Sequence, residues 1–322
     1  MSYTRINGTG SYVPDMVVTN EDFTKHIETS DEWIQSRTGI KERRYSEEMS
    51  TLDMAVNASL KAMEESDIDA SMIDLVIVAT VSGDNVFPGV SQLLQARLGL
   101  NVLMAFDVNA ACSGFLYAMN IADKMLQSGA YNHALVVGAE ALTRWTDFSD
   151  RNTCVLFGDA AGAMVISKSD HKGIVDVISY AKGDTDSLLI CKNPDAKTLE
   201  RNDGEVQDFI HMDGRNVFKF ATKVLVSTVH ELLERNNISL DDIDYIVCHQ
   251  ANERIIDKAS RDLDFPMDKM YLNISKYGNT SAASVPLAID EAIREKKIKK
   301  GDTFLTIAFG GGLTWAGALV KY

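Results

Sequence analysis

The same order of elements occurs twice along the 322-residue chain, and this repeat restricts the folds that the sequence can adopt. Each half has a short β-branched strand, a second extended piece, a helix with apolar residues at helical spacing, and a further strand. The expected ranges are 74–80, 105–109, 112–129 and 134–138 in the first half, and 244–248, 272–274, 281–300 and 304–308 in the second. The order predicts two α/β halves whose helices cover the sheets.

The boundary between the halves is expected near residues 167–173, where polar residues interrupt two β-rich runs. We therefore divide the chain into residues 1–170 and 171–322. Proline- and glycine-rich linker sequence is missing from this boundary, so the halves should pack closely. Residues 183–214 are polar and lack periodicity, and a loop of that length commonly lies over a binding site.

Composition excludes several classes of function. The formal net charge is −14, which disfavours binding to nucleic acid or to an anionic membrane, because both would be repelled. The uncharged stretch 304–320 is shorter than the ~20 residues of a membrane-spanning helix and has three glycines at its centre, so two buried strands joined by a turn are expected. Without a basic-then-apolar leader, the chain is predicted to be cytoplasmic.

The four cysteines are scattered, with no CxxC pair and no clustering with the six histidines, so neither a disulfide framework nor a metal site is predicted. Gly8-Thr-Gly10 has no third glycine at the spacing of a dinucleotide-binding motif and is followed by Pro14. A tight turn is the interpretation for that segment.

Cys112 is a candidate nucleophile, because it lies where a strand ends and an apolar helix begins, with small residues on both sides. A thiol at a helix N-terminus feels the positive end of the helix dipole, which is expected to lower its pKa. Taken alone, this position fits a buried and inert cysteine equally well.

His249 and Asn279 occupy related places in the second half. His249 ends a buried strand, and Asn279 precedes the helix that corresponds to the Cys112 helix. A satisfied core histidine and an ordinary turn with a helix cap are the alternatives. If the halves pack about a pseudo-twofold axis, thiol, imidazole and carboxamide converge in one cleft suited to acyl transfer.

The glycine run 310–312 can bring backbone N–H groups close to a ligand. We expect the amides of Gly311 and Cys112 to form an oxyanion hole. A hairpin turn is the plainer interpretation, and the two are compatible.

With these residues in view, the sequence closely resembles the β-ketoacyl-[acyl-carrier-protein] synthase III family, the initiating condensing enzymes of type II fatty-acid synthesis. The matching segments run in order through nearly the whole chain: 7–14, 29–34, 37–40, the Cys112 segment, 150–153, 157–159, 249–252, 278–284 and 309–312. The main departure is the polar stretch around residues 191–207.

The resemblance implies a thiolase-like five-layer α-β-α-β-α sandwich in a homodimer, with no cofactor and no metal. Cys112 would take an acyl group from acyl-CoA, with acetyl-CoA the expected primer. His249 and Asn279 would then stabilise the enolate formed when malonyl-acyl carrier protein (malonyl-ACP) loses CO2, and the enolate would attack the acyl-cysteine to give a 3-oxoacyl product. Neutral histidine and asparagine can donate hydrogen bonds to an oxyanion, which an ionised carboxylate cannot.

The resemblance also implies residues for CoA. Trp33 and Arg151 would stack on the adenine, and Arg37 would hold the phosphates. The pantetheine tunnel would be lined by Gly214, Phe218 and Asn252. Phe87 matches the position that reaches into the partner subunit's acyl pocket. For Trp33 alone, a half-buried structural aromatic is the simpler interpretation.

An acidic protein remains an acceptable partner if a local basic patch exists. Arg254, Lys258 and Arg261 fall on one stripe of the expected helix after His249, and Lys219 and Lys223 form a similar pair on the helix after Gly214. Spacing alone fits a solvated face equally well. In the family this patch docks ACP, and Arg254 matches its principal arginine.

Other enzymes of related chemistry fit the residues of this chain less well. A thiolase would need a second cysteine near the C-terminal glycines, elongating ketosynthases use two histidines, and a hydroxymethylglutaryl-CoA synthase would use a glutamate acid that we do not find. A related condensing enzyme of secondary metabolism remains an alternative. A non-catalytic ACP-binding subunit also remains, although Cys112 is present.

Overall fold

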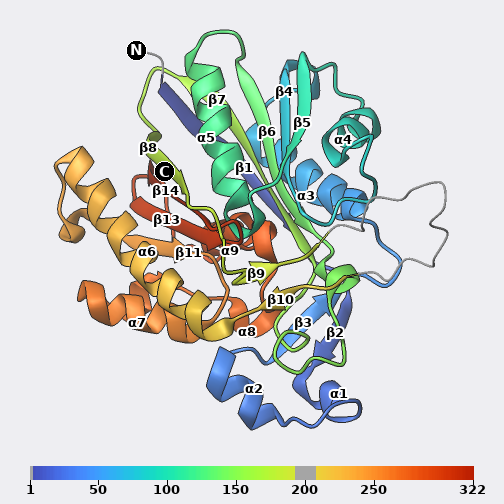
Figure 1. Cartoon of the computed structure of the whole chain (residues 1–322). Helices are drawn as coiled ribbons and strands as arrows, with labels where there is room; N and C mark the ends of the chain where they lie inside the picture. The colour runs from blue at the N-terminus through green and yellow to red at the C-terminus, as the bar shows by residue number, and fades with distance from the viewer. Residues whose placement is uncertain (1–2, 193–207) are drawn as a thin grey trace.

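A computed structural model describes residues 3–192 and 208–322. Two five-stranded sheets dominate it, each formed by one half of the chain (Figure 1). The elements of the first half are β1 (Tyr3–Tyr12), β2 (Met16–Thr19), α1 (Asn20–Thr24), α2 (Asp31–Thr38), β3 (Glu42–Tyr45), α3 (Thr51–Ser66), β4 (Leu75–Ala79), α4 (Val90–Leu98), β5 (Met104–Val108), the short 3-10 helix η2 (Ala111–Ser113), α5 (Gly114–Gln127), β6 (His133–Glu140) and β7 (Ala160–Ser169).

The second half repeats this order. Its elements are β8 (Ile174–Ala181), β9 (Leu189–Ile190), β10 (His211–Met212), α6 (Gly214–Asn236), β11 (Tyr245–Cys248), α7 (Glu253–Leu263), β12 (Met270–Tyr271), α8 (Ile274–Tyr277), the 3-10 helix η6 (Ser281–Ala283), α9 (Ser284–Arg294), β13 (Thr303–Gly310) and β14 (Thr314–Lys321).

The two sheets have the same connectivity. The strand order is β1-β7-β6-β4-β5 in the first and, counted from its β8 edge, β8-β14-β13-β11-β12 in the second. In both, the three strands at one end run parallel, and the two at the other end are antiparallel. The chain passes from one sheet to the other between β7 and β8, where the predicted boundary at residues 170 and 171 lies.

Alternation of side chains along the central strands builds three apolar layers. In β4, Leu75 and Ile77 face a core shared with α5, α9 and the second sheet, whereas Val76 and Val78 face α3 and α4. A third core joins α6 and α7 to the outer face of the second sheet. Helices, sheet, helices, sheet and helices form five layers, which confirms the predicted architecture.

The ranges differ from expectation at three places. The short extended piece of the second half is β12, two residues before the predicted 272–274, because residues from Ile274 on form α8. The predicted helix 281–300 starts with a 3-10 turn and ends at Arg294, six residues early. The predicted turn at Gly8-Thr-Gly10 is wrong, because these residues lie inside β1.

The two glycines of β1 serve close packing. A Cβ at Gly8 would lie 2.4 Å from the Ala62 carbonyl oxygen, and a Cβ at Gly10 would lie 2.4 Å from the Ala58 carbonyl oxygen. Both carbonyls belong to α3, so β1 can touch this helix only without side chains at these positions.

The uncharged stretch 304–320 forms the expected hairpin of β13 and β14. Within residues 3–192 and 208–322, no helix is both long and apolar enough to cross a membrane. The ends of the polar segment 183–214 meet in the pair β9–β10. Most of the stretch 191–207, where the sequence departs from the family pattern, lies outside the described residues.

Candidate active site

One cavity of about 1450 Å³ lies between the two halves, and Cys112, His249 and Asn279 all line it. Cys112 comes from η2 and Asn279 from the turn before η6, while His249 directly follows β11. The ends of the loop 183–214 contribute Leu189, Ile190 and residues 210–214 to the same cavity. The structure therefore brings the three predicted residues together and places the described ends of this loop beside the cavity.

Cys112 is held on a strained turn. The preceding Ala111 has φ of +47°, a left-handed conformation that is uncommon for a residue with a side chain. This turn places Cys112 in a buried position, with 8% of its surface exposed. Burial raises the pKa of the thiol to about 12, partly offset by a hydrogen bond with the Ser281 side chain. The expected lowering of the pKa by the helix dipole is therefore wrong, because desolvation of the thiolate outweighs it.

His249 is fully inside the protein and is held by two neighbours. Its Nδ1 hydrogen-bonds the hydroxyl of Ser284 at 2.6 Å, and its ring meets Phe309 edge-on with centroids 5.3 Å apart. Burial lowers the pKa of His249 to about 3, so the imidazole is neutral at physiological pH. Since Nδ1 is bound to Ser284, Nε2 is the ring nitrogen left for a ligand.

The backbone of the segment 156–158 fixes Asn279. The Asn279 amide donates to the Leu156 carbonyl at 2.8 Å, and the Gly158 amide donates to the Asn279 carbonyl at 3.1 Å. The side-chain oxygen of Asn279 accepts from the Ser281 amide at 2.9 Å. This leaves the NH2 group of the carboxamide as the donor for a ligand.

Gly310 lets β13 reach the nucleophile. A Cβ on this residue would lie 2.6 Å from the amide nitrogen of Cys112, a distance that side chains do not adopt. Gly311 and Gly312 follow it on the cavity wall. The proximity of this turn to the Cys112 amide is what an oxyanion hole made with Gly311 requires, and that role stays a prediction.

Two guanidinium groups lie over the indole of Trp33. The Cζ atom of Arg151 is 4.8 Å from the ring centroid and that of Arg37 is 5.0 Å away. Arg151 also donates to the Glu28 carbonyl at 2.9 Å. Trp33 and Arg37 line the cavity, and Arg151 joins them through the ring. The expected residues for the adenine and phosphates are therefore neighbours, and two of them line the cavity.

Gly214, Phe218 and Asn252 line the same cavity, as expected for tunnel residues. The Asn252 side chain also has a structural task. Its Nδ2 donates to the Arg37 carbonyl at 2.9 Å, and its Oδ1 accepts from the Arg254 amide at the start of α7. Asn252 thereby ties α2 of the first half to α7 of the second.

The basic residues divide into two groups. Arg254 and Lys219 line the cavity, while Lys223 lies further along α6. Lys258 and Arg261 pair with acidic residues of their own helix, Lys258 with Asp262 at 2.8 Å and Arg261 with Asp257 at 2.5 Å. The stripe on α7 is therefore less basic than its lysine and arginine spacing suggested.

Phe87 does not line the cavity of its own chain among the residues described. It is 85% exposed, beside Val86 at 97%, on the segment that leads to α4. Exposed apolar surface is common where proteins contact one another, and the expected place of Phe87 in a partner's acyl pocket stays a prediction.

The structure also adds residues that the sequence argument missed. Arg215 and Lys192 add positive charge to the lining of the cavity, and His211 also lines it. Ser284 holds His249, and Ser281 contacts both Cys112 and the buried carboxyl of Glu140. An alignment of the two repeats would have pointed to Ser281 and Ser284, because both lie directly after Asn279 in the segment that corresponds to the Cys112 segment.

The chain is similar over its whole length to proteins of one kind. Residues 106–183 match the domain described as 3-Oxoacyl-[acyl-carrier-protein (ACP)] synthase III, and residues 233–322 match its C-terminal domain. A β-ketoacyl-[acyl-carrier-protein] synthase III of Clostridium acetobutylicum is 46% identical over 323 residues, covering 100% of this chain and 99% of the relative. This chain belongs to the 3-oxoacyl-[acyl-carrier-protein] synthase III family.

Solved structures agree with this membership. The 3-oxoacyl-[acyl-carrier-protein] synthase III of Aquifex aeolicus has a TM-score of 0.92 and 44% identity, with 99% of this chain and 100% of that chain covered. A priming β-ketosynthase of the R1128 polyketide pathway has a TM-score of 0.91 at 36% identity, covering 99% and 96%. This synthase III is thus a condensing acyltransferase with a thiolase-like fold, and the alternative of a secondary-metabolism enzyme is not favoured.

Proposed function

We propose that this synthase III uses acetyl-CoA to acylate Cys112 and then condenses the acyl group with malonyl-ACP. The observation that carries the proposal is the convergence of Cys112, His249 and Asn279 on one cavity that Trp33 and Arg37 also line. A thiol, two neutral hydrogen-bond donors and a cationic aromatic pair fit a CoA thioester and its reaction. The reaction needs no metal and no cofactor beyond these thioester substrates.

In the first half-reaction, the sulfur of Cys112 attacks the thioester carbonyl and CoA leaves. The amides of Cys112 and Gly311 are the proposed donors to the tetrahedral oxyanion. The closeness of Gly310 to the Cys112 amide supports this role, because it puts the glycine turn beside the nucleophile.

In the second half-reaction, His249 and Asn279 bind the thioester carbonyl of malonyl-ACP. Loss of CO2 leaves an enolate, and its negative oxygen is stabilised by Nε2–H of His249 and by the NH2 group of Asn279. The low pKa of His249 supports this assignment, because a neutral ring held at Nδ1 by Ser284 can keep its proton at Nε2. The enolate carbon then attacks the acyl-cysteine and expels the Cys112 thiolate.

CoA is proposed to bind along the whole cavity. Its adenine would enter between Trp33 and Arg151, which now lie in contact, so that Arg151 moves when the base stacks. Arg37 would meet the phosphates, and Gly214, Phe218 and Asn252 would line the pantetheine arm.

ACP is proposed to dock at the cavity mouth. Arg254 and Lys219 line the cavity, and Lys223 lies one helical turn beyond Lys219. These cations would meet the acidic carrier protein. Lys258 and Arg261 would contribute less, because each already pairs with an aspartate.

The proposed assembly is a homodimer in the cytoplasm. Exposure of Phe87 and Val86 supports a dimer in which Phe87 enters the acyl pocket of the partner subunit. A large side chain at that place favours a small primer such as acetyl-CoA.

Intact-mass spectrometry after incubation with acetyl-CoA tests the central step. We expect an added acetyl group on Cys112 and, after addition of malonyl-ACP, a 3-oxoacyl-ACP product. Cys112→Ala should give neither. A wild-type protein that carries no acyl group on Cys112 would show that the proposed mechanism is wrong.

A further inference from the structure

Glu140 is a buried carboxylic acid that the mechanism above does not use. It ends β6 with none of its surface exposed. Burial raises the pKa of Glu140 to about 7, although four hydrogen-bond donors partly offset this. A carboxyl group of this kind can gain or lose a proton near neutral pH, where an ordinary glutamate is always ionised.

A hydrogen-bond path joins Glu140 to the nucleophile. The hydroxyl of Ser281 donates to Oε1 of Glu140 at 3.1 Å, and the Ser281 side chain also hydrogen-bonds the Cys112 thiol. When Ser281 donates to the carboxylate, its oxygen is left to accept from the thiol. When Glu140 holds the proton instead, the Ser281 hydroxyl can donate to the thiolate, and this is the hydrogen bond that lowers the pKa of Cys112. The path therefore has the polarity of a proton relay from Sγ through Oγ to Oε1.

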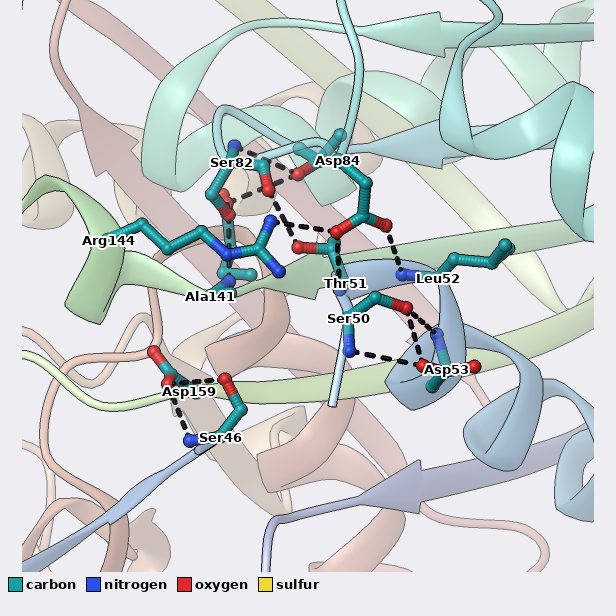
Figure 2. A network of polar contacts seen from close by, with 12 residues as sticks. Ser46, Ser50, Thr51, Leu52, Asp53, Ser82, Asp84, Ala141, Arg144 and Asp159 are labelled. Carbon is teal, nitrogen blue, oxygen red and sulfur yellow. Dashed lines mark hydrogen bonds and ion pairs between the residues drawn. The ribbon is translucent and has the colours of Figure 1, made fainter. Parts of the chain in front are cut away.

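The other carboxyl oxygen is held firmly in place. Oε2 accepts from the Ser82 hydroxyl at 2.5 Å and from the Val81 amide at 3.1 Å. Figure 2 shows that Ser82 is itself part of a network, in which its hydroxyl accepts from the Ala141 amide and its carbonyl accepts from Thr51. These hydrogen bonds fix the orientation of the Glu140 carboxyl group, so that its other oxygen stays directed at Ser281.

Among the described residues that interact with Glu140, the hydrogen-bond donors are neutral and Cys112 is titratable. The segment after β4 presents hydroxyls and an amide, and η6 presents the Ser281 hydroxyl and the Ala282 amide, all neutral. The titratable group facing Glu140 is the Cys112 thiol, whose pKa the Glu140 charge raises. Two buried acids that repel each other's negative charge hold one charge between them, so ionisation of one favours protonation of the other.

We propose that Glu140 stores the thiol proton of Cys112 during the catalytic cycle, with Ser281 as the relay. The inference rests on the proposed role of Cys112 as nucleophile. During acylation the Sγ–H proton passes to Ser281, and the Ser281 proton passes to Oε1 of Glu140. The sulfur then forms its bond to the acyl carbon, the bond from that carbon to the CoA sulfur breaks, and the CoA thiolate takes a proton from water.

During condensation the stored proton returns. The enolate forms the new carbon–carbon bond and expels Cys112 as a thiolate, which receives the proton from Ser281 while Ser281 receives one from Glu140. Over the whole cycle one proton from water is consumed, as decarboxylation of a malonyl carboxylate requires. Both Cys112 and Glu140 end the cycle in their starting states.

The pH dependence of Cys112 alkylation by iodoacetamide tests the relay without any substrate. Peptide mass spectrometry reports Cys112 separately from the exposed Cys191. In the wild type we expect the rate to rise with pH through an inflection near 7, as Glu140 becomes able to accept the proton. In Ser281→Ala and Glu140→Gln the inflection should disappear, and the rate at pH 7.5 should fall at least about tenfold.

Ser281→Ala is the more informative variant. Residue 281 has φ of +47°, and the corresponding Ala111 adopts the same value, so alanine fits this backbone. Ser113→Ala is the matched control, because its hydroxyl bonds the Ala110 carbonyl and Thr314 rather than Glu140. The control should keep the wild-type inflection. Single-turnover acylation by acetyl-CoA should fall by the same factor in Ser281→Ala as alkylation does.

The relay is overturned if Ser281→Ala keeps the wild-type pH profile and acylation rate. If Glu140→Gln fails to fold, as judged by its melting temperature, Ser281→Ala decides alone. A wild-type enzyme that is alkylated as described but not acylated by acetyl-CoA would instead refute the proposed function, so the two failures are distinguishable.

Discussion

The two helix starts at the centre of the molecule have one backbone design and different chemistry. Asn109 and Asn279 each accept from the amide two residues later, at 3.4 and 2.9 Å. Those later residues, Ala111 and Ser281, share φ of +47°. Each begins a short 3-10 turn that leads into a helix, but the next residue is Cys112 in the first half and Ala282 in the second.

The strands around these turns differ in the same complementary way. Leu75 pairs with Ala134 in the first half as Tyr245 pairs with Phe304 in the second, so Leu75 and Tyr245 occupy equivalent positions of the repeat. Four residues further along, Ala79 is therefore equivalent to His249. A Cβ added at Gly114 would lie 3.2 Å from the Cβ of Ala79, whereas His249 bonds Ser284, which corresponds to Gly114. Each half therefore provides one part of the site and keeps small residues where the other half needs room.

Replacing a close-packed glycine by alanine, in one strand of each half, should have the largest effect. Gly310→Ala places a Cβ 2.6 Å from the Cys112 amide, so the nucleophile must move, and we expect at least about 100-fold loss of acylation. Gly138→Ala places a Cβ 2.3 Å from the Ala282 carbonyl oxygen instead. That variant should lose about 1–3 kcal/mol of stability while Cys112 is still acylated.

Rapid-quench acylation assays and denaturant unfolding of both glycine variants make this measurement. Gly183→Ala is the control, since a Cβ there meets nothing within 4 Å. Equal loss of acylation in Gly138→Ala and Gly310→Ala would remove the distinction between the two helix starts.

Ser284→Ala should affect one half-reaction only. It removes the hydrogen bond that holds Nδ1 of His249, worth up to about 1.5 kcal/mol, so condensation should slow by up to roughly tenfold. Acylation of Cys112 should be unchanged, because Ser284 serves the second half of the site. The two steps are followed by intact mass and by product formation from malonyl-ACP, and equal slowing of both would contradict the assignment.

The buried acid and the buried base should give stability slopes of opposite sign. The pKa of His249 is about 3 against 6.5 for an ordinary histidine, so the unfolded chain gains a proton first and stability is lost as pH falls from 6.5 towards 3. The pKa of Glu140 is about 7 against 4.5, so the folded chain keeps a proton longer and stability is lost as pH rises from 4.5 to 7.

Urea unfolding at several pH values measures both slopes. Relative to wild type, His249→Asn should reduce the change in unfolding free energy with pH between 3 and 6.5, and Glu140→Gln should reduce it between 4.5 and 7. Each slope should change by about 1 kcal/mol per pH unit. Slopes of the same sign for the two variants would show that these groups do not titrate as their burial requires.

The smallest effect is expected at the basic residues proposed to bind ACP, which lie on α6 and α7 of the second half. Arg254→Ala should slow the malonyl-ACP step about fivefold at low salt, with less effect at high salt, and leave acylation by CoA intact. Lys258→Ala and Arg261→Ala should change it less, because Asp262 and Asp257 already neutralise them. Salt series of KM for malonyl-ACP provide the measurement, and equal effects of Arg254→Ala on both half-reactions would refute the docking role.

Much of the architecture could be predicted because strand and helix periodicity are local properties of the sequence. The repeat gave the two halves and the places of Cys112, His249 and Asn279. The turn predicted at Gly8 was wrong because glycine marks either a turn or a close approach, and only the position of α3 tells which. The basic stripe on α7 was overestimated because its aspartates were not counted with it.

The sequence alone determined that the chain repeats, that it is acidic, and that a thiol, an imidazole and a carboxamide follow strand ends. Only the tertiary structure decided their ionisation. Cys112 lies at a helix start, yet burial determines its pKa. In the sequence Glu140 is one of 46 acidic residues, and only the fold buries it in contact with Ser281. Desolvation and hydrogen bonds across the two halves depend on atoms far apart in the chain, so no local pattern records them.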